Sequence, residues 1–81
     1  MTASSQPGPL FAGVDGGGTG CRARIQDAEG RLLGTGIAGP AALRVGIDRA
    51  LGEVVKACRA ALEEAGLSSD ALRSVHAAVG L

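Results

Sequence analysis

Apolar and polar residues alternate in short runs along the first half of the chain, and these runs predict three β-strands. The run from Leu10 to Asp15 is almost wholly apolar and predicts a buried strand. From Cys21 to Gln26 the alternation has a period of two, which predicts a half-buried strand. Arg31 to Ile37 predicts a return strand that is weakened by its two glycines. The connection Asp27 to Gly30 ends in glycine, so we expect the last two strands to form a hairpin.

The second half of the chain predicts one long helix followed by a strand. Between about Gly46 and Ala65, apolar residues recur at the spacing of an amphipathic helix. Gly66 follows the last turn, as expected of a left-handed residue that ends a helix. Ser74 to Leu81 then predicts a strand buried on both faces, because both alternating sets are mainly apolar or small. The expected buried face of the helix comprises Ile47, Leu51, Val54, Cys58, Ala61, Leu62 and Ala65.

The remaining segments are predicted to be irregular. Residues 1–9 contain prolines and small polar residues and are expected to form a disordered lead-in. Gly39 to Ala42 predicts a loop, and Ser68 to Asp70 is expected to cap a short turn. The order strand, strand, strand, helix, strand indicates an α/β fold. Because a strand buried on both faces needs partners that the sequence does not supply, we expect residues 10–81 to be the N-terminal piece of a longer domain, inactive and poorly soluble alone.

Composition and charge exclude several classes of function. The 81 residues carry eight Lys and Arg and eight Asp and Glu, so a net charge of zero argues against nucleic-acid or polybasic membrane-surface binding. Phe11 is the single aromatic residue, which leaves no base-stacking platform. No apolar run reaches the roughly 18 residues that span a bilayer, and the start lacks a signal peptide's basic and apolar regions. We expect a cytoplasmic protein that binds neither nucleic acid nor membrane.

The cysteines and the histidine are expected to be structural. Cys21 and Cys58 follow no metal-binding spacing, so in a reducing compartment we expect them to be free and buried. His76 is the only histidine, and on a buried strand it is expected to be packed rather than catalytic. The acidic residues Asp27, Asp48 and Asp70 are interpreted as turn and helix-terminus residues.

The residues with chemical potential are concentrated in the turn after the first predicted strand. Asp15 is followed there by Gly16, Gly17, Gly18 and Thr19. Successive glycines let the backbone approach a ligand closely, and a concavity of N–H groups binds phosphate. Thr19 adds a hydroxyl donor. An acidic residue beside a phosphate requires a cation between them, so the motif predicts a metal–phosphate pair, most commonly Mg²⁺ with ATP.

Other glycine-rich motifs fit this turn less well. The P-loop requires a Gly-Lys-Ser/Thr ending, which is missing here. Gly18, Gly20 and Ala23 match the dinucleotide-binding fingerprint, but that fingerprint must open a helix, whereas this segment predicts a strand. A hairpin turn without a ligand is the simplest alternative, although such a turn needs only one or two glycines.

Longer stretches of the chain resemble a known ATPase family. The segment from Phe11 to Thr19, FAGVDGGGT, resembles the first phosphate motif of the actin/hexokinase/Hsp70 ATPase superfamily. Residues 20–25 (GCRARI), 30–36 (GRLLGTG), 38–41 (AGPA) and 77–81 (AAVGL) resemble the BadF/BadG/BcrA/BcrD ATPase family, and within it the N-acetylglucosamine and glucosamine kinase branch. The resemblance covers residues 10–81, which is nearly the whole chain.

The resemblance implies a ribonuclease-H-like, actin-like ATPase domain in a kinase that transfers phosphoryl from Mg-ATP to an amino-sugar hydroxyl. It implies that Asp15 holds Mg²⁺ and that the segment Gly16, Gly17, Gly18, Thr19 cradles the phosphates. It also implies that the loop Gly39 to Ala42 faces the sugar, although the family commonly has Asn in place of Ala42. Many relatives have Lys in place of Gly20. The catalytic base and the adenosine site are expected beyond residue 81, and a homodimer of the full-length protein is left open.

Two other interpretations stay open. Some relatives activate dehydratases by coupling ATP hydrolysis to electron transfer from an iron–sulfur cluster, and Cys21 and Cys58 do not offer the cysteines that such a cluster needs. A nucleotide-binding regulator without catalytic activity is the third interpretation. No helix-turn-helix precedes the motif, which argues against a DNA-binding regulator.

Overall fold

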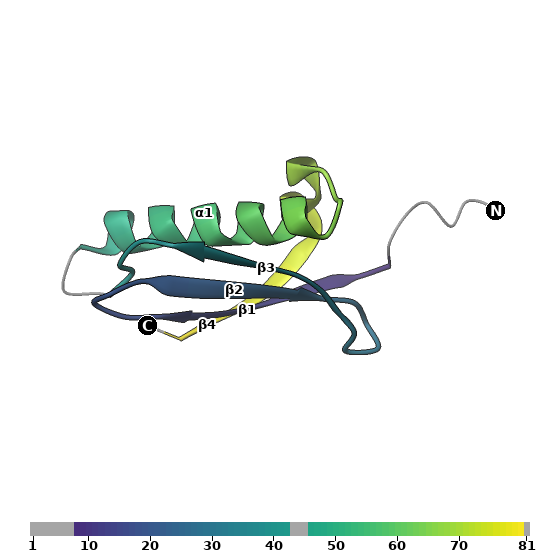
Figure 1. Ribbon diagram of the computed structural model, residues 1–81, viewed down its shortest axis with the longest axis horizontal. Helices are drawn as coiled ribbons and strands as arrows, with labels where there is room; N and C mark the ends of the chain where they lie inside the picture. The colour runs from purple at the N-terminus through teal and green to yellow at the C-terminus, as the bar shows by residue number, and fades with distance from the viewer. Residues whose placement is uncertain (1–7, 43–45, 81) are drawn as a thin grey trace.

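The predicted order of elements is confirmed by the structure, a computed structural model that describes residues 8–42 and 46–80 (Figure 1). The predicted lead-in, residues 1–9, lies outside these ranges except for Gly8 and Pro9. The predicted bounds of the strands and of the long helix differ from the observed ones by at most one residue. The elements are β1 (Leu10–Gly16), β2 (Cys21–Gln26), β3 (Leu32–Ala38), α1 (Ile47–Glu64), the 3₁₀ helix η3 (Ser69–Ser74) and β4 (Val75–Gly80).

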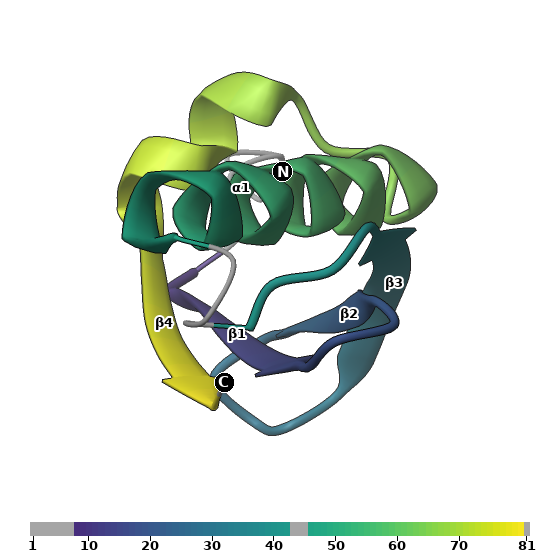
Figure 2. The same ribbon diagram turned by 90° about the vertical axis from the view of Figure 1, so that its left-hand side faces the viewer.

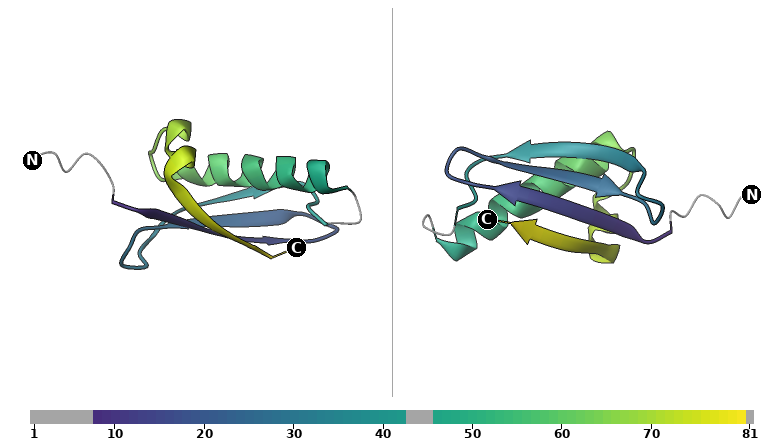
Figure 3. Two further views of the ribbon diagram at one scale, coloured as in Figure 1. Left: turned by 180° about the vertical axis from the view of Figure 1, so that it is seen from behind. Right: turned by 90° about the horizontal axis from the view of Figure 1, so that it is seen from below.

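The four strands form one mixed sheet in the order β3-β2-β1-β4. The pairs β1–β2 and β2–β3 are antiparallel, and β4 lies parallel to β1, as the view from below in Figure 3 shows. Asp15, near the end of β1, is the partner of Arg22 on β2 and of Gly80 on β4. Asp15 therefore lies on a strand that is flanked by β2 and β4, close to the turn that joins β1 to β2.

The helix α1 covers one face of the sheet, mainly over β3 and β2 (Figure 2). Gly34 and Gly36 of β3 are buried beneath it. A Cβ atom at Gly34 would overlap the backbone oxygen of Ala61, and one at Gly36 would overlap that of Ala57. These glycines therefore allow the close approach of helix and sheet, whereas the sequence suggested only that they weaken the strand. The core consists of Leu10, Ala12, Val14, Cys21, Ala23, Ile25, Ala41, Ala50, Val54, Ala57, Cys58, Ala61 and Leu62.

The end of α1 follows the predicted capping signals. Gly66 has a φ of 77°, which is the left-handed conformation that glycine adopts without strain. The N–H of Leu67 donates to the carbonyl of Leu62 at 2.9 Å and closes the helix end. Ser68 then caps η3, because its hydroxyl oxygen accepts a hydrogen bond from the N–H of Asp70 at 3.1 Å.

Part of the predicted helix face is wrong. Ile47 and Leu51 are 63% and 51% exposed, and Ala50 and Ala57 occupy the core instead. The helix crosses the sheet diagonally, and its first turns lie beyond the end of β4 (Figure 3). No described residue covers the side of those turns that carries Ile47 and Leu51.

The prediction that the last strand is buried on both faces is also wrong for the described residues. Val75 is half-buried, and the rest of β4 is exposed. The reason is that α1 contacts β1 little and leaves β4 uncovered. His76 is exposed rather than packed in a core, and its ring stacks on Phe11 with centroids 5.4 Å apart. Leu81 lies outside the described residues.

Candidate functional site

The glycine loop between β1 and β2, residues 17–20, is short and closed by a backbone hydrogen bond. The N–H of Gly17 donates to the carbonyl of Gly20 at 3.0 Å. In the described chain, positive φ angles occur at Gly30, Gly46 and Gly66, so no glycine of this loop has the left-handed conformation that favours glycine. A Cβ atom at Gly17 would meet no described atom within 4 Å. Neither backbone conformation nor packing explains glycine at this position, and its missing side chain leaves the loop open to a ligand.

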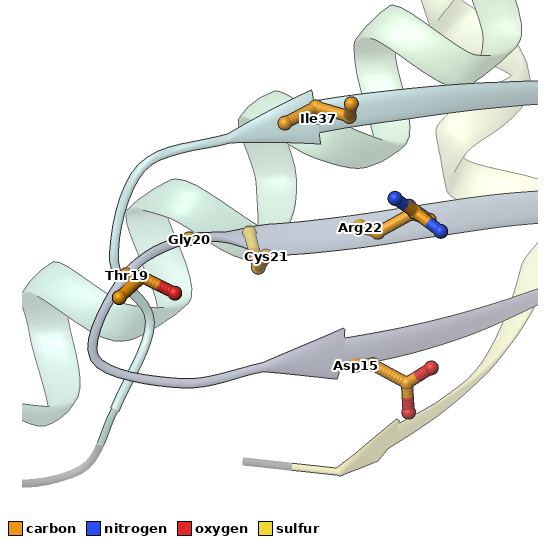
Figure 4. Close-up of a pocket in the computed structure, with 6 residues that line it drawn as sticks. All are labelled: Asp15, Thr19, Gly20, Cys21, Arg22 and Ile37. Carbon is orange, nitrogen blue, oxygen red and sulfur yellow. The ribbon is translucent and has the colours of Figure 1, made fainter.

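Beside the loop lies an open hollow of about 280 Å³ (Figure 4). Asp15 is exposed at its rim, and its carboxylate is directed toward the β4 side, whereas Thr19 projects its hydroxyl from the loop. Arg22 lies across from Asp15 on β2 and is also exposed. The ion pairs between described residues join Arg31 to Asp27 and Lys56 to Glu53. Asp15 and Arg22, the two charged residues at the hollow, therefore form no ion pair with a described residue. The lining residues are Asp15, Thr19, Gly20, Cys21, Arg22 and Ile37.

The loop after β3 lies against the glycine loop. The N–H of Ala41 donates to the carbonyl of Gly17 at 3.0 Å, and Ala41 is fully buried. Ala42 follows it and is half-buried. The fold thus brings together the two segments that the sequence singled out, residues 15–19 and the loop that ends at Ala42. Their direct hydrogen bond could not be predicted from motifs.

Glu53 of α1 holds the start of the same loop, a contact that sequence reasoning missed. Its Oε1 accepts a hydrogen bond from the N–H of Gly39 at 2.7 Å, and its Oε2 accepts one from Lys56 Nζ at 3.3 Å. The pKa of this carboxyl is held below its usual range, first by the Gly39 N–H and further by Lys56. The only signal in the sequence was a charged residue beside the apolar helix face.

Both cysteines are free and buried, as predicted. Burial raises the pKa of the Cys21 thiol, which donates weakly to the carbonyl of Glu53 at 3.5 Å. Burial also raises the pKa of Cys58, and the nearby Cys21 adds to the effect. Thiols with raised pKa values stay protonated near neutral pH and are poor nucleophiles or metal ligands.

The donor atoms at the hollow fit a phosphate-bound Mg²⁺ better than a metal site made of protein alone. Within residues 8–42 and 46–80, no group of three His, Cys, Asp or Glu side chains could hold a metal ion. Asp15 supplies a single exposed carboxylate, and Mg²⁺ is commonly bound through one or two carboxylates together with substrate phosphates and water. The other acidic residues interpreted as structural are indeed in turns or helix starts: Asp27 accepts hydrogen bonds in the β2–β3 turn, and Asp48 and Asp70 lie in first turns.

The helices in the described part of the chain are all too short or too polar to cross a membrane.

The structure defines an α/β protein with three antiparallel strands, one parallel strand and one covering helix, and with a glycine loop beside an acidic residue. Residues 12–81 match the model of the BadF/BadG/BcrA/BcrD ATPase family. The chain therefore belongs to this family, as its motifs predicted.

Two proteins that this chain resembles carry the names of amino-sugar kinases. The chain is 42% identical over 71 residues to the glucosamine kinase GspK of Vibrio cholerae serotype O1, a match that covers 88% of this chain and 24% of that protein. Its fold matches the crystal structure of a Chromobacterium violaceum protein assigned to the N-acetylglucosamine kinases, with a TM-score of 0.84 and 34% identity over 91% of this chain and 26% of the other. This match confirms the predicted actin-like ATPase fold, and the chain spans about a quarter of the length of these relatives.

Proposed function

We propose that this chain is the N-terminal, phosphate-binding part of an ATP-dependent amino-sugar kinase. The full-length enzyme transfers the γ-phosphoryl group of Mg-ATP to a hydroxyl of glucosamine or N-acetylglucosamine. The choice of sugar is supported by the two relatives, which are named for these sugars. We place the enzyme in the cytoplasm, where ATP is available as the phosphoryl donor.

The observation that carries the phosphate-binding role is the open glycine loop next to an exposed acid. Gly17 has open space where a side chain would stand, and Asp15 carries a charge that forms no ion pair with another described residue. A loop of this kind lets phosphate oxygens approach the backbone closely. Arg22 lies across the strand pair from Asp15 and adds positive charge to the same hollow.

Each residue then has a distinct role in the proposed enzyme. Asp15 holds Mg²⁺, and the segment Gly16, Gly17, Gly18, Thr19 cradles the phosphates. The bound Mg²⁺ neutralises the negative charge of the transferring phosphoryl group. The loop that ends at Ala42 lies beside the glycine loop and borders the sugar. The chain's contribution is therefore to bind and orient the phosphates, which is where most of the rate enhancement in phosphoryl transfer arises.

The test is a substrate panel with the full-length protein. Glucosamine, N-acetylglucosamine, glucose and water alone are each offered with Mg-ATP, and ADP release and sugar phosphate are measured separately. We expect much more sugar phosphate to form from one or both amino sugars than from glucose or in the reaction without sugar. ADP release without any sugar phosphate would reject the kinase and favour an ATPase of the dehydratase-activator kind. Absence of both products would favour a non-enzymatic nucleotide-binding protein.

A further inference from the structure

Glu53 is a charged residue placed where the helix meets the sheet. Its side chain is only 19% exposed, although it lies on α1 among residues that face solvent. A carboxylate in such a position loses hydration and is tolerated when hydrogen bonds replace it. Here the N–H of Gly39 donates to Oε1 at 2.7 Å. A Cβ atom at Gly39 would stand 3.0 Å from Oε1, so glycine at this position leaves the carboxylate room to approach.

The contacts of Glu53 continue to both sides of the glycine loop. Two residues after Gly39, the N–H of Ala41 donates to the carbonyl of Gly17 at 3.0 Å. On the other side, the loop ends at Gly20, and the thiol of the next residue, Cys21, donates to the backbone carbonyl of Glu53 at 3.5 Å. Glu53 therefore binds the segment that supports the loop through its side chain, and it contacts the strand that leaves the loop through its backbone carbonyl.

We infer that Glu53 is a positioning residue that sets the place of the glycine loop through Gly39 and Ala41, and so tunes its affinity for the phosphates of ATP. This inference rests on the proposed function of the loop. The bond to Gly39 carries the effect, and the ion pair with Lys56 is secondary, because Lys56 is largely exposed and exposed pairs contribute little. Lys56 and Arg49 on α1 are the charged groups that lower the pKa of this carboxylate, and the carboxylate in turn raises the pKa of the Cys21 thiol on β2.

Three substitutions of Glu53 separate two properties of its side chain: whether an oxygen reaches the N–H of Gly39, and whether the side chain is charged. Glu53→Gln keeps an oxygen within reach of the Gly39 N–H and removes the charge. Glu53→Asp keeps the charge and withdraws the carboxylate by one methylene. Glu53→Ala removes both. Glu63→Ala is the matched control, since Glu63 is exposed on the same helix and its side chain forms no hydrogen bond with another described residue.

The experiment measures Mg-ATP affinity by titration calorimetry and backbone hydrogen exchange by mass spectrometry, both in the full-length protein. We expect Glu53→Asp and Glu53→Ala to weaken Mg-ATP binding about tenfold, the loss typical of removing a residue that orients a binding group. Glu53→Gln and Glu63→Ala are expected to bind like the wild type. Exchange at residues 39–42 and 17–20 should rise in the Asp and Ala variants alone.

The inference is overturned if Glu53→Gln behaves like Glu53→Ala, because charge rather than the bond to Gly39 would then be responsible. It is also overturned if the Asp and Ala variants match Glu63→Ala. If Glu53→Ala does not fold, the Gln and Asp variants still decide between these results. Failure of the proposed function gives a different result from failure of this inference. If the wild-type protein binds no Mg-ATP or phosphorylates no sugar, hydrogen exchange at residues 39–42 and 17–20 still shows whether Glu53 positions the two loops.

Discussion

The backbone N–H of Ala41 donates a hydrogen bond to the carbonyl of Gly17 at 3.0 Å. This bond joins the loop after β3 to the turn between β1 and β2, two segments that are distant in the sequence. A kinase must bring an acceptor hydroxyl to the terminal phosphate, and reacting atoms about 3–3.5 Å apart require rigid positioning. The bond between Ala41 and Gly17 fixes the proposed sugar-side loop relative to the proposed phosphate loop.

The residue after Ala41 offers a test of sugar binding. Ala42 is half-buried and has no polar side chain, whereas the family resemblance led us to expect Asn at this position. Ala42→Asn should add a side-chain hydrogen bond to the sugar and lower the KM for it about three- to tenfold, since a net hydrogen bond contributes about 0.5–1.5 kcal/mol. Steady-state kinetics of the full-length protein with varied sugar at saturating ATP provide the measurement. An unchanged or raised KM would remove this loop from the sugar site.

Asp15 is the residue proposed to hold the metal. Asp15→Asn keeps the size of the side chain and removes its charge, so the fold should be retained while kcat falls by about a hundredfold or more, the range seen when one electrostatic contact to a transition state is lost. Far-UV circular dichroism checks the fold. The control is Asp70→Asn, because Asp70 is exposed on η3 and does not line the hollow. Turnover that stays at the wild-type level in Asp15→Asn would contradict the assignment.

Two glycine substitutions, one in β3 and one in α1, are expected to change the free energy of unfolding in opposite directions. Together they test how closely α1 packs on the sheet. Gly34→Ala places a Cβ atom against the backbone of Ala61 and should destabilise the full-length protein by about 1–3 kcal/mol, the cost of overpacking. Gly52 is exposed on α1 with open space around it, so Gly52→Ala should stabilise by about 0.5–1 kcal/mol through helix propensity. Urea denaturation measures both. A Gly34→Ala variant as stable as wild type would mean that the helix does not approach β3 this closely.

The lowered pKa of Glu53 predicts the direction of a pH effect on stability. Because the folded-state pKa lies below that of an ordinary glutamate, about 4.3, the carboxylate stabilises the fold above that pH. The contribution is lost as the pH falls through the lowered folded-state value. Thermal unfolding of wild type and Glu53→Gln between pH 7 and pH 3 should therefore show a difference that shrinks on acidification. A difference that stays constant or grows would show that Glu53 gains no stabilisation from its charged form.

The sequence predicted the order of the elements, because their apolar periodicity and their turn residues are local signals. Gly66 at the end of α1 and the alternation in β2 are examples in which one short segment determines its own conformation. Asp15 and the glycines are also consecutive, so the sequence alone singles them out, and their phosphate-binding role stays a prediction.

The errors arose where burial depends on distant segments. Ile47 and Leu51 fit the periodicity of a buried face, but both are exposed, because the diagonal path of α1 carries its first turns past the end of β4 (Figure 3). The strand β4 is apolar enough to be buried, yet among the described residues no layer covers it. The contacts of Glu53 with Gly39, and of Ala41 with Gly17, join residues whose proximity no local pattern encodes.

The central claim is that the loop at Gly17 is open because a phosphate approaches it. A methyl group at Gly17 meets no described atom within 4 Å, and the residue is not among those with positive φ, so Gly17→Ala should leave folding intact. The decisive measurement is calorimetric titration of full-length Gly17→Ala with Mg-ATP, with Gly52→Ala as the matched glycine-to-alanine control. The account predicts wild-type Mg-ATP affinity for Gly52→Ala. For Gly17→Ala it predicts at least about tenfold weaker binding, equivalent to about 1.4 kcal/mol, with a melting temperature no lower than that of the wild type. Equal Mg-ATP affinity in the two variants would contradict it.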